Sequence, residues 1–406
     1  MRTVRVIGNV EPGGGQLSAL RLGVALGRRG CDIRFLAGSA TAAGVELFRS
    51  HGVEIEVYEA SRNLQYECDE GFSRWLAPRL ASADLVHAHQ FGAWWAAARA
   101  APAAVPVVGS EHNAYQWPGE VPVGELRSAL DALDLLFVHG PTAREQLLAL
   151  GADQAMLREG RSAIDSIDLV QPARSPVRRL VYAGRLHHEK GPDLLLEAFA
   201  LLSERPPLDL VGSGPLEPEL RLRARQLGIE DDVVFAGWRQ CPAEWIAGAL
   251  ACVVPSRHDA WSQTAVLAMA LGVPVVGTAV EGLEHVLSAR RGLAVAPEDP
   301  QELARVLDSL LQGHVRTDLQ AGRRYAAKFT PERVADLYEH TYIELLERRG
   351  AKAAWEPRVK PSWFPALPVE GARRQQPPVS HSTSRTSKGS GTRSPAPPSS
   401  PRILDT

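Results

Sequence analysis

The feature that most constrains the fold is a regular alternation of short β-rich runs with amphipathic helical stretches, which begins at the first residues and restarts near residue 180. Parallel strands joined by crossover helices give this pattern, because each helix returns the chain to the same end of the sheet. The predicted strands of the first half are Val4–Ile7, Ile33–Leu36, Val53–Val57, Leu85–His87, Val105–Val108 and Leu135–Val138, with helices that include Gln16–Arg29, Phe72–Ala81 and Thr142–Leu150.

The second half repeats the pattern. Its predicted strands are Leu180–Ala183, Leu208–Val211, Val233–Ala236, Ala251–Val254 and Pro274–Gly277, and its helices are expected to open near Glu189, Leu216, Pro242 and Ser262. A chain of 406 residues is long enough for two domains. We therefore predict an α/β fold of two Rossmann-like, doubly wound domains that face a cleft, with ligands beyond the carboxyl ends of the strands.

The expected domain limits follow from composition. We place the first domain at residues 1–168, a hinge in the segment 164–178 rich in Pro, Ser and Asp, and the second domain at residues 175–330. Thr330-Pro331-Glu332 is a good helix start, and the helix over residues 331–350 is expected to return toward the first domain. Residues 351–406 are rich in Pro and Ser, and we expect a disordered basic tail in which Trp355, Trp363 and Phe364 form either a docking motif or a packed cluster.

Charge is distributed unevenly along the chain. The formal net charge is −2, but residues 351–406 hold nine Lys and Arg against three Asp and Glu, so the rest is mildly acidic. This balance argues against nucleic acid as a partner. Arg21, Arg28 and Arg29 on the first helix, together with the basic tail, leave weak peripheral contact with anionic lipid open.

The location of the protein is suggested by its cysteines and its N-terminus. Four cysteines lie far apart, at neither zinc-ligand nor thioredoxin spacing, and the first residues lack the apolar core of a signal peptide. The uncharged stretch Ala260–Val280 contains Gly272 and Pro274, so it predicts a buried helix, turn and strand rather than a membrane span. We expect a cytoplasmic protein with reduced cysteines.

Glycine-rich loops and cations follow the predicted strands. Gly13-Gly14-Gly15-Gln16 opens the first helix, where free backbone amides favour an anion such as a phosphate, although a plain flexible turn is the alternative. In the second half, Arg185 and Lys190 lie between a strand and a helix, and a guanidinium fork beside an ammonium suits a diphosphate better than a solvated turn does. Further loops at the same edge are Gly212-Ser213-Gly214, Phe235-Ala236-Gly237-Trp238 and Pro255-Ser256 with Asp259.

The ordered set GRLHHEKG, LVGSGP, VVFAGW and PSRHDAWSQTAVLAMALGVPVVGT resembles the donor domain of glycosyltransferase family 4, which has the two-domain GT-B fold. The resemblance covers roughly residues 1–345 and includes the GGGQ loop. It implies a retaining transfer of a sugar from a nucleoside-diphosphate sugar to a hydroxyl acceptor. The first domain would then lie on the acceptor side, and the second would bind the donor.

The resemblance also implies roles for individual residues. Arg185 and Lys190 would hold the donor diphosphate, and Gly14 and Gly15 would close over the phosphates. His112, after a first-domain strand, would contact the donor sugar. The other implied contacts are Gln16 to the acceptor, Gly212 and Gly214 to the donor, and Trp238 to the nucleobase.

One position departs from the family pattern. Of the family's paired glutamates, the first falls on Asp259 and the second on Leu267, and leucine has no group that can hydrogen-bond a ribose. Ser262, Gln263 and Thr264 could take that role, the backbone alone could hold the ribose, or activity could be lost.

The implied mechanism needs neither a covalent nucleophile nor a metal. Arg185, Lys190 and the loop amides would stabilise charge on the leaving phosphate, while Asp259 and His112 grip sugar hydroxyls. No Asp-x-Asp motif stands in the donor loops, and we expect no cofactor. His87 and His89 have H-x-H spacing, but a cleft-lining or structural role is favoured over a metal site.

Two other functions remain open at this point: a catalytically silent nucleotide-sugar-binding or scaffold protein, and a nucleotide-sugar epimerase. The acceptor would be shaped by the loops Asn63–Asp69, Phe91–Trp95 and His112–Trp117, whose aromatic rings could stack on a sugar or could simply pack. The sequence leaves the donor nucleotide, the acceptor and the oligomeric state undetermined.

Overall fold

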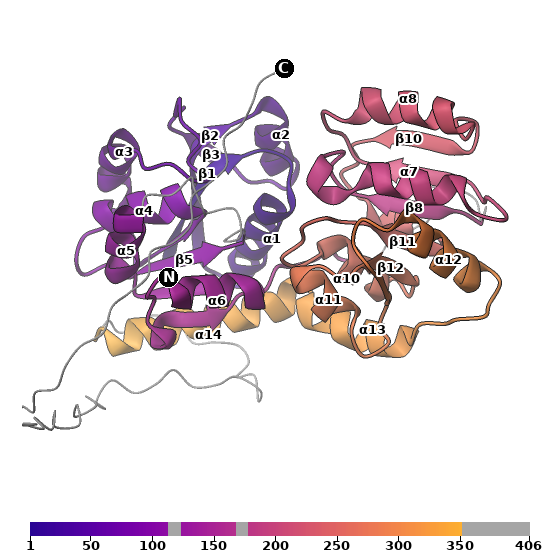
Figure 1. Cartoon of the computed structure of the whole chain (residues 1–406). Coiled ribbons are helices and arrows are strands. Elements are labelled where there is room, and N and C mark those ends of the chain that lie inside the picture. Colours follow the sequence, from indigo (N-terminus) through magenta and orange to yellow (C-terminus); the bar gives the residue numbers. More distant parts are fainter. Residues whose placement is uncertain (113–122, 168–177, 351–406) are drawn as a thin grey trace, which may run out of the picture. The chain divides into compact units, whose positions relative to one another are not determined.

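The computed structural model describes residues 1–112, 123–167 and 178–350. Within these residues the chain forms two parallel β-sheets with helices on both faces (Figure 1), which confirms the predicted fold class. We call residues 1–167 the first domain and residues 178–329 the second domain.

The first sheet has the strand order β3-β2-β1-β4-β5-β6-β7. Every strand pair in it is parallel, as the crossover pattern predicts. The strands are β1 (Arg2–Val10), β2 (Asp32–Ala40), β3 (Ile55–Val57), β4 (Leu85–His89), β5 (Val107–Glu111), β6 (Leu135–Val138) and β7 (Leu157–Glu159).

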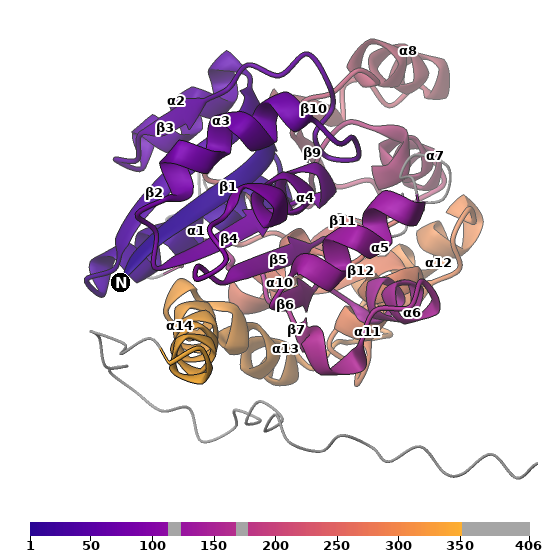
Figure 2. The same ribbon diagram turned by 90° about the vertical axis from the view of Figure 1, so that its left-hand side faces the viewer.

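Helices cover this sheet on both faces (Figure 2). They are α1 (Gly14–Arg28), α2 (Ala42–Ser50), α3 (Glu70–Leu80), α4 (Phe91–Ala100), α5 (Val123–Ala132) and α6 (Pro141–Ala149). Buried side chains of α3 to α6 form one apolar core with some of the strand side chains. Buried side chains of α1 and α2 belong to two other cores, which contain different side chains of the strands. Because successive strand residues point to opposite faces, one strand contributes to cores on both faces.

The second sheet has the order β10-β9-β8-β11-β12-β13 and is also parallel. Its strands are β8 (Leu180–Ala183), β9 (Leu208–Val211), β10 (Val233–Gly237), β11 (Ala251–Val254), β12 (Val275–Thr278) and β13 (Leu293–Val295). One core packs against α7 (Pro192–Ala200), α8 (Glu217–Leu227) and α12 (Pro300–Leu311), and another packs against α9 (Ala243–Ile246), α10 (Gln263–Ala270), α11 (Glu281–Leu287) and α13 (Leu319–Ala326).

The last described helix, α14 (Pro331–Arg348), follows the second domain in sequence but packs on the first. Its Tyr338 and Tyr342 are buried in one core with Leu22 of α1 and Phe137 of β6. Arg29, at the end of α1, forms ion pairs with two α14 carboxylates. The helix therefore ties the end of the second domain to the first domain.

The strand order places the site. In each sheet the order reverses at the first strand of the domain, so β1 lies beside β4 and β8 lies beside β11. Loops that leave the carboxyl ends of such neighbouring strands diverge to opposite faces and open a crevice. Most of the predicted site residues lie in or just beyond these loops.

Some boundaries differ from the prediction. No α-helix begins at Glu189: the 3-10 turn η3 (His188–Lys190) comes first, and α7 begins only at Pro192. Gly191 separates them because it adopts a left-handed conformation, with φ of 61°. The short edge strands β7 and β13 were not predicted. The hinge residues 168–177 and the tail 351–406, with its basic charge and aromatic cluster, lie outside the described residues.

Two other expectations can be compared with the structure. The uncharged stretch forms α10, a turn and β12, as predicted, and in the described part of the chain no helix is long and apolar enough to cross a membrane. All four cysteines are free. Of the three arginines that left lipid contact open, Arg21 and Arg29 are largely buried in ion pairs with carboxylates, whereas Arg28 is exposed, and contact with lipid stays a prediction.

Candidate active site

Two pockets meet at the glycine loop that follows β1. Gly14 of that loop and Arg185 beyond β8 line both of them. The first pocket is also lined by Gly15, Gln16, Gln65, Tyr66, His89, Gln90, His112, His139, Ser162, Lys190, Ser256, Asp259 and Ser262, and the second by Arg21, Asp165, Gly212, Gly214, Trp238 and Leu267. Gln263 and Thr264, at the start of α10, reach both pockets.

The amino end of α1 presents free backbone amides to these pockets. Its N-cap is Gly13, which has extended backbone and no side chain to cap the first amides. These amides carry the positive end of the helix dipole. Gln263 holds the loop in place, since its Nε2 donates to the Gly14 carbonyl at 2.6 Å while its Oε1 accepts from Arg21 at 3.0 Å.

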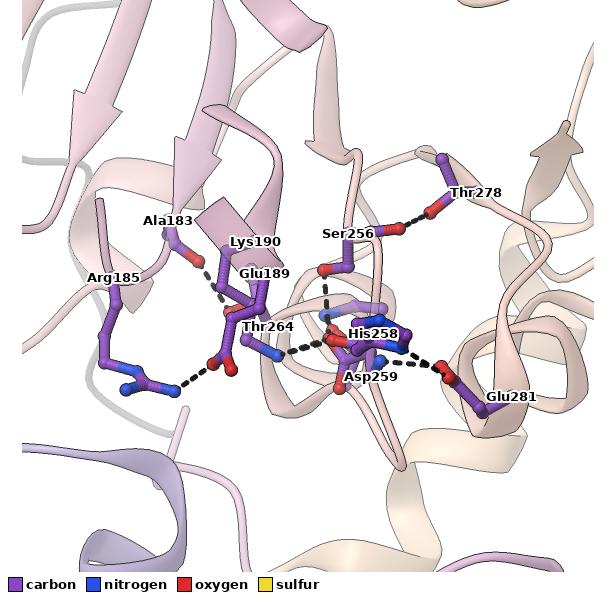
Figure 3. Close-up of polar contacts among 12 residues, drawn as sticks. Ala183, Arg185, Glu189, Lys190, Ser256, His258, Asp259, Thr264, Thr278 and Glu281 are labelled. Atoms are coloured by element: carbon purple, nitrogen blue, oxygen red, sulfur yellow. Dashed lines mark hydrogen bonds and ion pairs between the residues drawn. The ribbon is translucent and has the colours of Figure 1, made fainter. Parts of the chain in front are cut away.

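The two cations of the second domain lie beside carboxylates (Figure 3). Arg185, whose side chain is 51% exposed, forms an ion pair with Glu189. Lys190 Nζ lies 3.2 Å from Asp259 Oδ2 and donates to the His258 carbonyl at 3.3 Å. Each of the two cations is thus paired with a carboxylate just beyond β8, and an anion such as a phosphate can bind both cations by replacing the carboxylates.

Two glycines allow the close backbone approach that builds this edge. A Cβ on Gly191 would stand 2.0 Å from the Pro255 carbonyl oxygen, so glycine lets η3 lie against the loop after β11. Gly212 has a φ of 148°, and a Cβ there would stand 1.8 Å from the Gly184 carbonyl oxygen. Both positions exclude other residue types for steric reasons.

Asp259 is oriented by its neighbours. The side chain is buried, and its Oδ2 accepts from Ser256 Oγ at 3.2 Å. The Asp259 backbone amide donates to Glu281 Oε2 at 2.9 Å, and Glu281 Oε1 lies 2.8 Å from His258 Nδ1. Glu281 therefore clamps the loop that carries Asp259, a role that no sequence motif indicated.

Leu267 is buried in the second-domain core and also lines the second pocket. The three residues proposed as substitutes for a ribose contact all have structural partners. Ser262 Oγ accepts the Ala265 amide and caps α10, Thr264 Oγ1 donates to the Ala183 carbonyl at 2.8 Å, and Gln263 holds the glycine loop. The structure thus gives all three a structural role, and a ribose contact from them stays a prediction.

Three histidines form a row along the first-domain wall of the first pocket. The ring of His112 lies 5.8 Å from that of His89 and 3.9 Å from that of His139. Burial and the nearby Arg5 lower the pKa of His112 to about 4, and burial lowers the pKa of His89 and His139 well below the usual value. The row is therefore neutral near pH 7 and offers hydrogen bonds instead of charge. Within the described ranges, no group of three or more His, Cys, Asp or Glu is arranged to hold a metal.

The structure brings together all the predicted site residues around the two pockets. Gln16 and His112 line the first, while Gly212, Gly214 and Trp238, which is 43% exposed, line the second. Sequence reasoning missed Arg21, Glu281 and His139. No sequence motif marks these residues, because each reaches the site only through the folded arrangement of distant segments.

The three predicted acceptor loops have three different outcomes. Gln65 and Tyr66, in the first of these loops, line the first pocket. The stacking role offered for the Phe91–Trp95 loop is wrong, because Trp94 and Trp95 lie on α4 and are buried in the first-domain core. Residues 113–117 of the third loop lie outside the described residues.

Comparisons with known proteins identify the family of the chain. Residues 12–158 match the family described as Glycosyltransferase Family 4, and residues 177–313 match the family described as Glycosyl transferases group 1. The D-inositol 3-phosphate glycosyltransferase of Xylanimonas cellulosilytica is 31% identical over 311 residues, which cover 66% of this chain and 74% of that protein. The protein of the same name from Jonesia denitrificans is 29% identical over 308 residues, which cover 65% and 70% of the two chains.

Solved structures share the fold. Anabaena HepE in complex with UDP-glucose superposes with a TM-score of 0.69 at 20% identity, covering 84% of this chain and 99% of that one. Sucrose-phosphate synthase from Thermosynechococcus elongatus gives 0.68 at 21% identity, covering 86% and 100%. Together with the matched family regions and the Xylanimonas relative, they show that the chain belongs to glycosyltransferase family 4 and is a glycosyltransferase with the GT-B fold.

Proposed function

We propose that this glycosyltransferase moves a sugar from a nucleoside-diphosphate sugar to a hydroxyl of an acceptor, with retention of the anomeric configuration. The observation that carries the proposal is the position of Arg185 and Lys190. Both line the first pocket, together with the uncapped amino end of α1. Two cations and a row of free amides are the groups that stabilise a diphosphate.

The two pockets divide the substrates on this proposal. The diphosphate lies where the pockets meet, at Gly14 and Arg185. The nucleoside extends into the second pocket beside Gly212, Gly214 and Trp238, and the ring of Trp238 offers a flat apolar face to the base. The donor sugar and the acceptor then occupy the first pocket.

Catalysis would come from stabilisation of the leaving group. As the glycosidic bond breaks, negative charge builds on the β-phosphate, and on this proposal Arg185, Lys190 and the α1 amides stabilise it there. Asp259 and the neutral His112 hydrogen-bond hydroxyls of the donor sugar. The mechanism assigns no step to a metal ion, so we expect EDTA to leave the transfer rate unchanged.

Relatives and neighbours suggest which substrates to test first. Curated relatives are named for D-inositol 3-phosphate, and a structural neighbour is described with UDP-glucose. The amide side chains of Gln16, Gln65 and Gln90 in the first pocket suit a ring that carries several hydroxyls. We therefore propose a cyclitol or a monosaccharide as the acceptor.

The test begins with donor binding. UDP-, GDP-, ADP- and dTDP-sugars are screened for thermal stabilisation of the purified protein, and the best donor is then offered to free and phosphorylated cyclitols and monosaccharides. The double variant Arg185→Ala with Lys190→Ala should bind that donor at least 100-fold more weakly and transfer no sugar. Full turnover by this variant would show that Arg185 and Lys190 do not hold the donor diphosphate.

A matched control separates the loss of diphosphate binding by Arg185 and Lys190 from a general loss of positive charge. Arg205 and Lys328 are exposed second-domain cations outside both pockets, so their double alanine variant should keep donor binding and turnover. The same assay distinguishes the alternatives. A silent binding protein would never release nucleoside diphosphate, and an epimerase would convert the donor without an acceptor.

A further inference from the structure

His89 lies at the carboxyl end of β4, against a buried cation on β1. Arg5 is fully buried, and its Nη2 lies 2.7 Å from His89 Nε2. Its Nη1 lies 3.3 Å from His87 Nδ1 and 3.4 Å from the Tyr342 hydroxyl. The guanidinium is thus held between two strand histidines and the returning helix α14.

This contact selects one tautomer of His89. A guanidinium can only donate hydrogen bonds, so His89 Nε2 must accept. The ring is neutral near pH 7, because burial first, and then the neighbouring His87 and Arg5, lower its pKa. A neutral imidazole whose Nε2 accepts carries its proton on Nδ1. The Nδ1–H of His89 is therefore a hydrogen-bond donor.

This Nδ1–H group has no hydrogen-bond partner among the described residues. His89 Nδ1 is buried without a hydrogen bond, and the residue is only 5% exposed. Buried N–H groups in proteins are nearly always bonded, so an unbonded one on a residue that lines a pocket calls for a partner from a bound molecule. The His89 ring lines the first pocket and stacks on His112 at an interplanar angle of 17°.

We infer that His89 donates a hydrogen bond from Nδ1 to an oxygen of the acceptor substrate, and that Arg5 is the positioning residue that sets this tautomer. The inference rests on the proposed function, since it takes the first pocket as the acceptor's site. The acceptor is favoured over the donor because His89 is a first-domain residue that lines the first pocket, as Gln16 and Gln90 do, and does not line the second pocket. The Arg5 charge behind the ring polarises its N–H and makes it a stronger donor.

Two substitutions test which ring nitrogen of His89 donates the hydrogen bond. His89→Asn places an amide nitrogen near the position of Nδ1, whereas His89→Gln places its amide near Nε2 and leaves the Nδ1 position without a donor. The acceptor is the fastest one from the panel of free and phosphorylated cyclitols and monosaccharides. His89→Gln should raise the acceptor KM at least 10-fold and His89→Asn less than 3-fold, with the donor KM unchanged in both. An acceptor KM within 2-fold of the parent for His89→Gln, or a rise in the donor KM alone, would overturn the inference.

A spectroscopic measurement tests the tautomer without turnover. In protein with ¹⁵N-labelled histidine, long-range ¹H–¹⁵N correlations identify which ring nitrogen carries the proton, and the His89 signals are assigned by their loss in His89→Gln. His89 should be the Nδ1–H form, and Arg5→Met, which replaces the cation with an apolar side chain, should shift it toward the other tautomer. An Nε2–H signal in the parent protein contradicts the inference. Failure of the parent to transfer sugar would instead contradict the proposed function, because the tautomer is read independently of activity.

Discussion

Asp259 shows how a single residue combines two tasks at this site. It holds Lys190 through an ion pair and lines the pocket where the donor sugar is expected. The sequence predicted the carboxylate and the cation from their motifs. It gave no sign of Glu281, whose contact with the Asp259 amide depends on how the first turn of α11 packs beside the loop that follows β11. Motif residues could thus be predicted singly, but the side chains that orient them could not.

Replacing Asp259 with Asn tests its role directly. The amide keeps the size of the side chain but loses the charge that holds Lys190 and grips a sugar hydroxyl. Because hydrogen bonds to charged groups contribute about 1.5–3 kcal/mol, kcat/KM should fall about 10- to 100-fold. Steady-state kinetics with the best donor measures the change, with circular dichroism as the check on folding. A fall of less than 2-fold would contradict the assignment.

The histidine row and the adjacent His87 make stability depend on pH. His87, His89, His112 and His139 have pKa values lowered in the folded state, so the unfolded chain binds more protons below its ordinary histidine pKa of about 6.5. Stability is therefore complete above about pH 6.5 and is lost as the pH falls toward 4. At pH 5 each of these neutral histidines should lower the free energy of unfolding by about 2 kcal/mol relative to its value above pH 6.5.

Urea denaturation at pH 7.5 and pH 5 measures this effect. His139→Asn should reduce the difference in unfolding free energy between the two pH values, since one of the neutral histidines is removed. Equal stability at both pH values would show that the row is not held neutral.

At the scale of elements, the sequence predicted the parallel strands well because buried β-branched runs are a strong signal. It was less successful where a turn is set by contacts far along the chain. The 3-10 turn η3 precedes α7 because Gly191 is left-handed and fits under the Pro255 carbonyl, a contact that crosses from one strand loop to another. Short edge strands such as β13 were missed for the same reason, since their pairing is what defines them.

Gly212→Ala tests whether the close approach of the loops that follow β8 and β9 builds the site. The new Cβ would collide with the Gly184 carbonyl oxygen, so the loop that carries Arg185 should shift and donor binding should weaken at least 10-fold. Gly228→Ala is the matched control, because Gly228 also has positive φ but has open space around it. That variant should lose about 1 kcal/mol of stability and keep its donor affinity. Equal donor affinity in the two variants, measured by calorimetry, would contradict the role given to Gly212.

At the scale of the whole molecule, α14 packs a segment that follows the second domain onto the first. The sequence predicted this helix from the Thr-Pro-Glu start and its return from its place after the second domain, but its partner residues could not be predicted. Arg29 Nη1 lies 2.7 Å from Asp336 Oδ1 and also pairs with Glu339, and these groups are largely buried. Such a network depends on two surfaces that meet only in the folded chain.

Arg29→Ala should destabilise the protein by about 3 kcal/mol, because it leaves two buried carboxylates without their cation. Chemical denaturation gives the change in unfolding free energy. Arg28→Ala, at the preceding position on α1, is the control and should change it by less than 0.5 kcal/mol. Similar values for the two variants would mean that α14 is not held by this network.

The central claim is that the cations beyond β8 and the amides of α1 hold a nucleoside-diphosphate sugar for transfer to a hydroxyl. The most direct measurement follows a reaction of the purified protein with its best donor and acceptor by ³¹P and ¹H NMR. We predict that nucleoside diphosphate and glycoside appear in equal amounts, that the product keeps the anomeric configuration of the donor, and that the Arg185→Ala, Lys190→Ala variant forms neither. Inverted product, conversion of the donor without an acceptor, or full activity of the double variant would contradict the account.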